Sequence, residues 1–195
     1  MTINEKSNSL FIKNFNDYIS NLQEALGLLP FKDVNNLADL IYGSIISGNS
    51  IFIAGNGGSF ANSMHIAADF SNTLHFLGQS CRFLSLGSNP AQVTATANDT
   101  NYSNIFVREF QSLSKAGDLL IILSGSGNSD NVIQLAEYSI KSSINCIGVV
   151  GFDGGKLKNI CENLVHINVN DMEISEDLQL IVFHLIKNYL ISKFQ

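Results

Sequence analysis

The sequence has little of several features that mark particular classes of protein. Its 195 residues include no tryptophan, two prolines, three cysteines and only two arginines, Arg82 and Arg108. Lysine and arginine together number 11 against 17 aspartates and glutamates, so the formal net charge at pH 7 is −6. Because no run of basic residues is present to neutralise phosphates, the composition argues against direct nucleic-acid binding.

The few cysteines and the short apolar runs exclude further classes. Cys81, Cys146 and Cys161 are far apart and odd in number, which argues against a disulfide framework or a thiolate zinc site. We interpret them as small buried side chains in a reducing cytoplasm. The longest apolar run, Leu119–Leu123, is too short to span a membrane, and the first residues show no secretory signal. We therefore expect a cytoplasmic protein without a membrane partner.

The apolar spacing predicts a single domain over the whole chain, with a helical arm at residues 1–48. Hydrophobic residues make up 45% of the sequence, enough for a sizeable core. Apolar side chains recur every three to four residues over about Leu10–Leu29, which indicates an amphipathic helix. A second helix is predicted from Asp33, as its N-cap, to Gly48. We expect this pair to pack on the main domain or on another subunit, and to serve oligomerisation.

Residues 49–195 alternate between strand-length and helix-length segments. The predicted strands are apolar nearly throughout, which is typical of a parallel sheet covered on both faces. The alternation predicts an α/β fold, an open three-layer αβα sandwich with right-handed crossovers. A last amphipathic helix is predicted over about Ser175–Lys193. The predicted strands are Ile51–Ala54, Arg82–Leu86, Leu119–Leu123, Asn145–Val150 and Leu164–Val169.

Two polar, glycine-rich loops follow strands of this predicted sheet. In an open parallel sheet, ligands bind at the carboxyl ends of the strands beside helix N-termini. The first loop, residues 55–59, reads GNGGS, and the second, residues 124–129, reads SGSGNS and precedes a helix that begins at Asp130. Glycines allow close backbone approach, while hydroxyls and free N–H groups bind phosphate. The loops therefore predict a phosphate site, with an ordinary capped turn as the alternative.

The nucleotide-binding motifs fit these loops poorly. Both loops begin like G-x-G-x-x-G, but the last position is Phe60 in one and Asp130 in the other, and no acidic residue follows the second strand. Walker A also fails, since Lys156 is followed by Leu157. A phosphate held by serines, without lysine or magnesium ligands, indicates a sugar phosphate and no nucleotide cofactor.

The motifs GNGGS, MH, AND, LSGSGNS and GFDGG, in this order, resemble those of the sugar isomerase (SIS) family, and within it the bacterial phosphoheptose isomerases. The resemblance covers nearly the whole chain. It implies a flavodoxin-like parallel sandwich and a homotetramer. Enzymes of this family interconvert sedoheptulose 7-phosphate and D-glycero-D-manno-heptose 7-phosphate, a step towards the heptose of lipopolysaccharide and other surface glycans.

Matching positions carry the family's binding roles onto this chain. The resemblance implies that the neighbouring subunit's last helix contributes Gln179 to the site, and that the Asn-Asp pair after the predicted second strand binds the sugar chain. Taken alone, that pair would more often be only a helix cap. The implied phosphate-binding residues are Ser124, Gly125, Ser126 and Ser129. The implied sugar-binding residues are Asn56, Gly57, Gly58, Ser59, Asn98, Asp99 and Gln179.

The resemblance also implies the catalytic residues. The family uses a His and a Glu one helical turn apart, with a Gln and a His on the last helix, and the same groups form a zinc site. The matching residues here are His65, Asp69, Gln179 and Lys187. This implies Asp69 as the base, catalytic roles for His65 and Lys187, and His65, Asp69 and Gln179 as metal ligands. On spacing alone, His65 would be a packed helix residue.

Two substitutions depart from the family pattern. Asp69 replaces a glutamate, which shortens its reach by about 1.5 Å. Lys187 replaces a histidine, and because an ammonium repels a metal ion, we expect an incomplete zinc site. As an alternative, Lys187 supplies the positive charge itself, by pairing with Asp69 or polarising the substrate oxygen. His184 lies about 140° from Gln179 around the helix, so we expect it to be packed or solvent-facing rather than a ligand.

These observations leave two classes of function. The first is an aldose–ketose isomerase acting on a heptose phosphate or a similar sugar phosphate. The second is a non-catalytic protein that binds a sugar phosphate or, like the replication-initiator-associating relatives of the family, serves as a scaffold. The intact phosphate motif favours the enzyme, since a scaffold would have little need of it.

Overall fold

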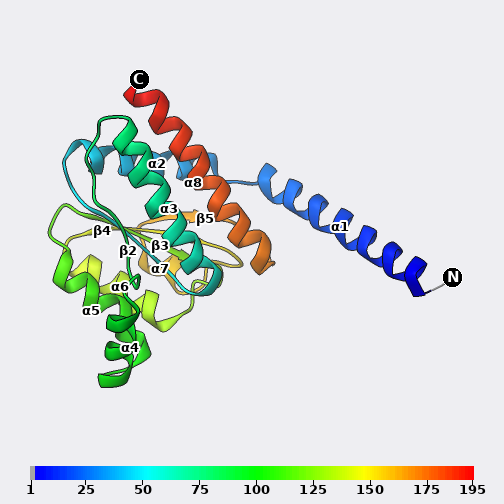
Figure 1. Ribbon diagram of the computed structural model, residues 1–195. Helices are drawn as coiled ribbons and strands as arrows, with labels where there is room; N and C mark the ends of the chain where they lie inside the picture. The colour runs from blue at the N-terminus through cyan, green and yellow to red at the C-terminus, as the bar shows by residue number, and fades with distance from the viewer. Residues whose placement is uncertain (1–2) are drawn as a thin grey trace.

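The computed structural model describes the backbone of residues 3–195 and the side chains of residues 8–195. Over this range, five parallel strands form one sheet with helices on both faces (Figure 1). The strands are β1 (Ile51–Gly55), β2 (Phe83–Ser85), β3 (Leu119–Ser124), β4 (Asn145–Val150) and β5 (Asn163–His166). The helices are α1 (Ile3–Gly27), α2 (Phe31–Ile46), α3 (Gly57–Phe76), α4 (Pro90–Asp99), the 3₁₀ turn η1 (Tyr102–Asn104), α5 (Ile105–Leu113), α6 (Asp130–Lys141), α7 (Leu157–Ile160) and α8 (Met172–Phe194).

The strand order β2-β1-β3-β4-β5 confirms the predicted parallel, flavodoxin-like sandwich. This order places a topological switch point between β1 and β3, where successive crossovers leave on opposite sides. The register aligns Gly55 at the end of β1 with Leu123 near the end of β3. The two glycine-rich loops therefore leave the sheet side by side.

Alternate residues of the central strands supply two separate cores. On one face of the sheet, Ile53 and its neighbours pack against α2, α3 and α8. On the other face, Phe52 packs against α5, where its ring meets that of Phe110 edge-on at 5.0 Å between centroids. On the first face, the buried rings of Phe70 on α3 and Phe183 on α8 lie 6.0 Å apart. This contact holds α3 and α8 side by side.

Several element boundaries differ from the predicted ones because of local capping. Asp33 lies in the first turn of α2 rather than at its N-cap, which is Pro30. The last helix begins at Met172, not near Ser175, because the Asp171 side chain accepts the Ile174 N–H at 3.0 Å. The predicted second and fifth strands extend past the observed ends of β2 and β5, at Ser85 and His166.

The two N-terminal helices behave differently. Helix α2 packs on the main domain, with Leu37 and Ile41 fully buried. Helix α1 begins earlier than the predicted Leu10 and extends away from the body of the molecule (Figure 1). Near its end, the Tyr18 hydroxyl donates a hydrogen bond to Asp177 on α8 at 2.5 Å. That bond raises the pKa of Tyr18 to about 12.

The cysteines form no disulfide, as the sequence predicts. Cys146 and Cys161 are buried with their sulfur atoms 3.8 Å apart, and Cys81 is partly buried. Burial raises the pKa of the Cys81 thiol to about 11. Among the helices of residues 3–195, none combines the length and the apolar character needed to cross a membrane.

Candidate active site

The two glycine-rich loops are locked together at the switch point. The side-chain amides of Asn56 in the first loop and Asn131 on α6 exchange two hydrogen bonds, of 2.8 and 2.9 Å. The Tyr102 hydroxyl donates a third bond to the Asn56 oxygen at 3.2 Å. Neither Asn131 nor Tyr102 was singled out from the sequence, because nothing in their local pattern shows that they meet the first loop. These contacts fix the spacing between the first loop and the start of α6.

The second loop is held by its own serines. The Ser124 hydroxyl accepts the Gly127 N–H at 3.0 Å, and the Ser126 hydroxyl accepts the Asn128 N–H at 3.3 Å. Ser129 is the N-cap residue of α6, and its side chain makes no capping bond. The three hydroxyls and the first N–H groups of α6 thus gather at one helix N-terminus, which favours an anion.

Residues 151–156, which contain the GFDGG motif, form the wall of this loop. The Gly151 N–H donates to the Gly125 carbonyl at 2.9 Å, and the Lys156 N–H donates to the Asn128 side chain at 3.1 Å. Gly127 has a φ of +64°, and a Cβ there would collide with the Gly154 carbonyl. A hollow of about 350 Å³ lies beside the loop. It is lined by Ser126, Asn128, Phe152, Asp153, Asn170 and Met172.

A carboxylate that the sequence analysis missed lies over the first loop. Glu176, on the first turns of α8, lies so close to Gly58 that a Cβ at that glycine would collide with its carboxylate. Partial burial raises the pKa of Glu176, and the hydrogen bond from the Ser59 N–H opposes that rise. The signal was present in the sequence, since Glu176 lies three residues before Gln179 and therefore on the same helix face.

Gln179 also reaches the first loop, and it does so within its own chain. Its side-chain nitrogen donates to the Ser59 hydroxyl at 3.2 Å, and its oxygen accepts from Asn62 at 3.1 Å. The side chain is 1% exposed. This contact with the first loop forms within one chain, because α8 runs directly beside the start of α3. The contribution of Gln179 to the site of a neighbouring subunit stays a prediction.

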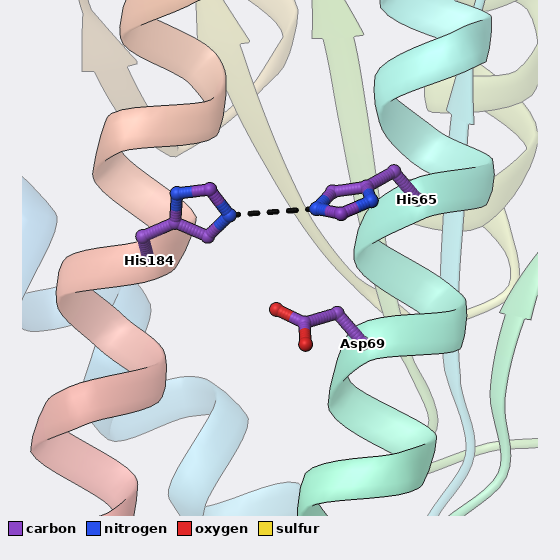
Figure 2. Close-up of side chains that lie close together, drawn as sticks. All are labelled: His65, Asp69 and His184. Carbon is purple, nitrogen blue, oxygen red and sulfur yellow. Dashed lines mark hydrogen bonds between the residues drawn. The ribbon is translucent and has the colours of Figure 1, made fainter.

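A second group of side chains, which we call the α3–α8 cluster, consists of His65, Asp69, His184 and Lys187. The Lys187 ammonium lies 2.7 Å from Asp69 Oδ2, and both side chains are about three-quarters buried, with exposures of 24% and 25%. This is the ion pair that the sequence analysis put forward as one role for Lys187. The Nε2 atoms of His65 and His184 lie 3.4 Å apart (Figure 2).

His184 was expected to be packed or solvent-facing rather than a ligand, and the structure places it beside His65. It is exposed, as predicted, but its ring points at His65 and Asp69 (Figure 2). The prediction for His184 was based on its angle from Gln179 around the axis of α8. Helix α8 runs along α3, so Gln179 contacts the first turns of α3 and His184 contacts its middle. The angle between the two residues therefore does not decide which of them faces α3.

The donor atoms of the α3–α8 cluster fit a metal ion. One ligand atom from each of His65, Asp69 and His184 lies within 4.8 Å of the other two. Two nitrogens bound to a tetrahedral zinc at about 2.0–2.1 Å are about 3.3 Å apart, close to the observed Nε2–Nε2 distance. Gln179, a predicted ligand, has both polar atoms of its amide bonded to Ser59 and Asn62 instead.

The predicted site residues thus fall into two places. Asp69 comes 12 residues after Gly57 on α3, which is about 18 Å along the helix axis. The two loops lie at the N-terminal end of that helix. Asp69 is therefore separated from the loops of its own chain by about three turns of α3.

Asn98 and Asp99 lie at the end of α4, beside η1. The Asn98 side chain donates to Asp99 at 3.1 Å, and both residues are exposed. The alternative that this pair caps a following helix is wrong, because the two residues are the last of α4. Tyr102, three residues later, contacts Asn56, so this segment lies beside the first loop.

Comparisons with known proteins bear on this arrangement. The family described as SIS domain matches residues 12–151. A probable phosphoheptose isomerase of Thermoplasma acidophilum is 31% identical over 168 residues, covering 85% of this chain and 91% of the relative. The phosphoheptose isomerase of Helicobacter hepaticus is 30% identical over 178 residues, covering 91% of this chain and 90% of the relative.

Solved structures show the same fold. The phosphoheptose isomerase of Neisseria gonorrhoeae superposes with a TM-score of 0.83 at 25% identity, covering 98% of this chain and all of that one. The Vibrio vulnificus NanR protein, solved in complex with ManNAc-6P, has a TM-score of 0.63 at 14% identity and covers 97% of this chain and 65% of that one. At that identity, the second likeness concerns the fold alone.

Proposed function

The chain belongs to the SIS domain family, and on that premise we propose that it is a phosphoheptose isomerase that interconverts sedoheptulose 7-phosphate and D-glycero-D-manno-heptose 7-phosphate. The observation that carries the proposal is the pair of loops locked side by side at the switch point by Asn56 and Asn131. The product would supply heptose for surface glycans from the cytoplasm. No nucleotide is required.

The second loop binds the phosphate. Ser124 and Ser126 each use their hydroxyl oxygen to accept a backbone N–H, which leaves their hydroxyl hydrogens free to donate to a phosphate oxygen. Ser129 and the backbone at Gly125 complete the binding surface. The N–H groups at the start of α6 add the field of the helix dipole. This arrangement holds the dianion without a lysine, in keeping with the sugar-phosphate interpretation.

The first loop and the end of α4 hold the sugar. The exposed backbone of Gly57 and Gly58 lets the sugar approach closely. Ser59, Asn98 and Asp99 offer hydroxyl, amide and carboxylate partners for the sugar hydroxyls. Asn56 and Gln179 act mainly by fixing the loop, because their side chains are already bonded to protein groups.

Glu176 is the carboxylate that the chain offers at its own sugar site. The isomerisation needs a base that removes a proton from the carbon next to the carbonyl, gives an enediol, and returns the proton to the neighbouring carbon. Glu176 lies against Gly58 and Ser59, where the reacting end of the sugar would lie. Its raised pKa brings the carboxyl closer to the operating pH, which suits a group that both takes and returns a proton.

The α3–α8 cluster acts on a substrate held by a neighbouring copy of the chain. Asp69 lies about three turns along α3 from the loops of its own chain, which favours a substrate that meets His65, Asp69 and Lys187 across an interface. There the Lys187 ammonium stabilises the oxyanion of the enediol. Asp69 and His65 orient the ammonium and carry the oxygen-bound proton. A metal ion held at the cluster would polarise the carbonyl oxygen. The site is thereby completed in the homotetramer that the family resemblance implies.

Turnover of sedoheptulose 7-phosphate by single variants tests the base. We expect Glu176→Gln to lower kcat by about 10²–10⁴ with a small change in KM, the range typical of a lost general base. Glu137→Gln, an exposed carboxylate on α6, is the matched control and should leave kcat unchanged. If Asp69→Asn abolishes turnover while Glu176→Gln spares it, the base is Asp69, as the sequence predicts. If the purified wild type binds the sugar phosphate without turnover, the chain is a binding protein.

Mixed oligomers test whether the site is shared between copies. Glu176→Gln and Lys187→Met remove groups from the two different halves of the proposed site. When the two inactive variants are co-expressed with different tags and purified as mixed oligomers, some interfaces combine two intact halves, so we expect a share of the activity to return. No recovery in mixed oligomers would show that the α3–α8 cluster does not act across an interface.

A further inference from the structure

Cys146 and Cys161 form a pair of thiols that the proposed mechanism does not use. Cys146 is the second residue of β4, and Cys161 is the C-cap residue of α7. Their sulfur atoms lie 3.8 Å apart, and each residue is 6% exposed. Because the sulfur atoms of a disulfide are only about 2.0 Å apart, the observed contact is that of two reduced thiols.

The pair is held by packing at the start of β4. Side chains two residues apart on a strand point to the same face, so Cys146 and Gly148 share one face of β4. A Cβ at Gly148 would lie 3.6 Å from the Cys161 sulfur, so Cys161 packs over this glycine and beside Cys146. Both cysteines belong to the core that also contains Phe52. Core packing therefore keeps the two sulfur atoms in contact.

The hydrogen bond between the two thiols makes them unequal. This bond lowers the pKa of Cys161, against the burial that raises it, and the same bond raises the pKa of Cys146. Since the thiolate is the reactive form of cysteine, Cys161 is the nucleophile of the pair and Cys146 stabilises its thiolate. A thiolate beside a second thiol that can resolve its oxidised form is the arrangement found in redox-sensing cysteines.

A small oxidant can reach the pair from solvent. A hollow of about 260 Å³ lies beside the start of β4, and Cys146 is one of its lining residues. Asn145 and Glu162, which also line it, are exposed. A hydroperoxide is small and uncharged, so neither the narrow approach nor the Glu162 carboxylate keeps it out.

We propose that Cys146 and Cys161 are a modification site at which a hydroperoxide forms a reversible disulfide. The Cys161 thiolate attacks a peroxide oxygen and the O–O bond breaks, which gives a sulfenic acid and a hydroxide that takes up the thiol's proton as water. The Cys146 thiol then attacks the sulfenic acid sulfur, and the S–O bond breaks to release a second water. Two thiols are thereby oxidised to a disulfide while hydrogen peroxide is reduced to two waters.

The disulfide acts on the second loop through α7. The Cys161 N–H donates to the Leu157 carbonyl at 2.9 Å, and the Leu157 N–H donates to the Gly127 carbonyl at 3.1 Å. Helix α7 has only four residues, and Leu157 is fully buried. Bond formation closes the sulfur–sulfur distance from 3.8 Å to about 2.0 Å, and α7 carries this displacement to the loop. The effect on substrate rests on the proposed function, which places the phosphate at that loop.

Treatment of the reduced full-length protein with a small excess of hydrogen peroxide tests the bond. After unfolding and alkylation with N-ethylmaleimide, mass spectrometry counts the free thiols, and a non-reducing digest identifies linked peptides. We expect the number of alkylated cysteines to fall from three to one, with Cys81 still free, and dithiothreitol to restore all three. Three free thiols after treatment, or oxygen added to a cysteine without a linked peptide, would refute the site.

Dimedone, which labels sulfenic acids, tests the order of the two steps. In Cys146→Ser, the serine hydroxyl can still donate to the Cys161 sulfur but cannot resolve its sulfenic acid, so we expect label on Cys161. Cys161→Ser should give no label on Cys146. Cys81→Ser is the matched control and should form the disulfide as the wild type does. Circular dichroism confirms that each variant is folded, and label on Cys146 alone would contradict the assignment of Cys161 as the nucleophile.

Calorimetric titration with sedoheptulose 7-phosphate tests the effect on the second loop. We expect the apparent affinity of the oxidised protein to be about fivefold or more below that of the reduced protein, the low end of typical coupling between two sites. Cys161→Ser treated with peroxide should bind as the reduced wild type does. Equal affinities would refute the coupling and leave the mapped disulfide in place. If the reduced protein binds no sugar phosphate, the proposed function and the coupling fail together, and the thiol count still decides the disulfide.

Discussion

At the scale of single residues, Gly58 shows how closely the fold brings Glu176, the proposed base, to the backbone. A Cβ at this position would collide with the Glu176 carboxylate, which is the flexible end of a long side chain. We therefore expect Gly58→Ala to displace Glu176 at little cost in stability, and to lower kcat/KM for sedoheptulose 7-phosphate at least tenfold. Thermal unfolding and steady-state kinetics measure the two effects separately.

Gly43→Ala is the matched control for that substitution. Gly43 lies in α2, outside both loops, and nothing lies within 4 Å of a Cβ built there. Alanine should raise stability by about 0.5–1 kcal/mol, because glycine weakens a helix interior, and leave turnover unchanged. A Gly58→Ala variant with full activity would argue against the role of Glu176.

Glu109 gives the fold a pH dependence of its own. The side chain on α5 is 9% exposed and accepts the Gly87 N–H at 2.6 Å. Burial raises its pKa above the ordinary value of 4.5, and the bond from Gly87 opposes the rise. The pKa of Glu109 is therefore higher in the folded state than in the unfolded state. The stability that this group contributes is present below about pH 4.5 and is lost as the pH rises through the folded-state pKa.

Glu109→Gln makes that dependence measurable. The glutamine oxygen can still accept the Gly87 N–H, but the side chain carries no charge to bury. We expect the Tm of the variant, relative to that of the wild type, to increase as the pH is raised from 4 to 8. Thermal melts followed by circular dichroism at several pH values measure this difference. A difference that stays constant across that range would show that Glu109 does not titrate in this way.

At the scale of elements, the sequence predicted the strands well and the helix starts less well. The central strands are buried on both faces, so their apolar runs mark them unambiguously, and β4 has the predicted bounds Asn145–Val150. Helix starts depend on caps that the apolar spacing does not show. Pro30 and Asp171 begin α2 and α8, whereas the periodic pattern pointed to Asp33 and Ser175.

The site was predictable only where it lies within one element or one motif. The serines of the second loop are contiguous, and their shared helix N-terminus follows from the strand–loop–helix pattern. The contact between His65 and His184 spans 119 positions and depends on how far α8 slides along α3. That offset is set by packing of buried rings such as Phe70 and Phe183, which no spacing rule on one helix reveals.

At the scale of the whole molecule, α1 carries an apolar face that its own chain leaves exposed. The helix extends from the body (Figure 1), and its first half exposes Phe11 and Phe15 to 71% and 56%, along with Leu10 and Ile12. An isolated amphipathic helix is only marginally stable, so an apolar face of this kind is stabilised by burial against a partner. The proposed sharing of the active site between copies requires association as well.

We therefore expect the wild type to be an oligomer, the tetramer implied by resemblance, and the double variant Phe11→Ser, Phe15→Ser to be a smaller species. Light scattering after size-exclusion chromatography measures the mass of each species. The double variant Lys13→Ser, Asn16→Ser on the same helix is the matched control.

The α/β sandwich buries its own core without α1, so its fold should survive dissociation. Because the α3–α8 cluster would then lose the substrate of its neighbour, turnover should fall together with the oligomer. Full activity in a dissociated variant would place the whole active site within one chain.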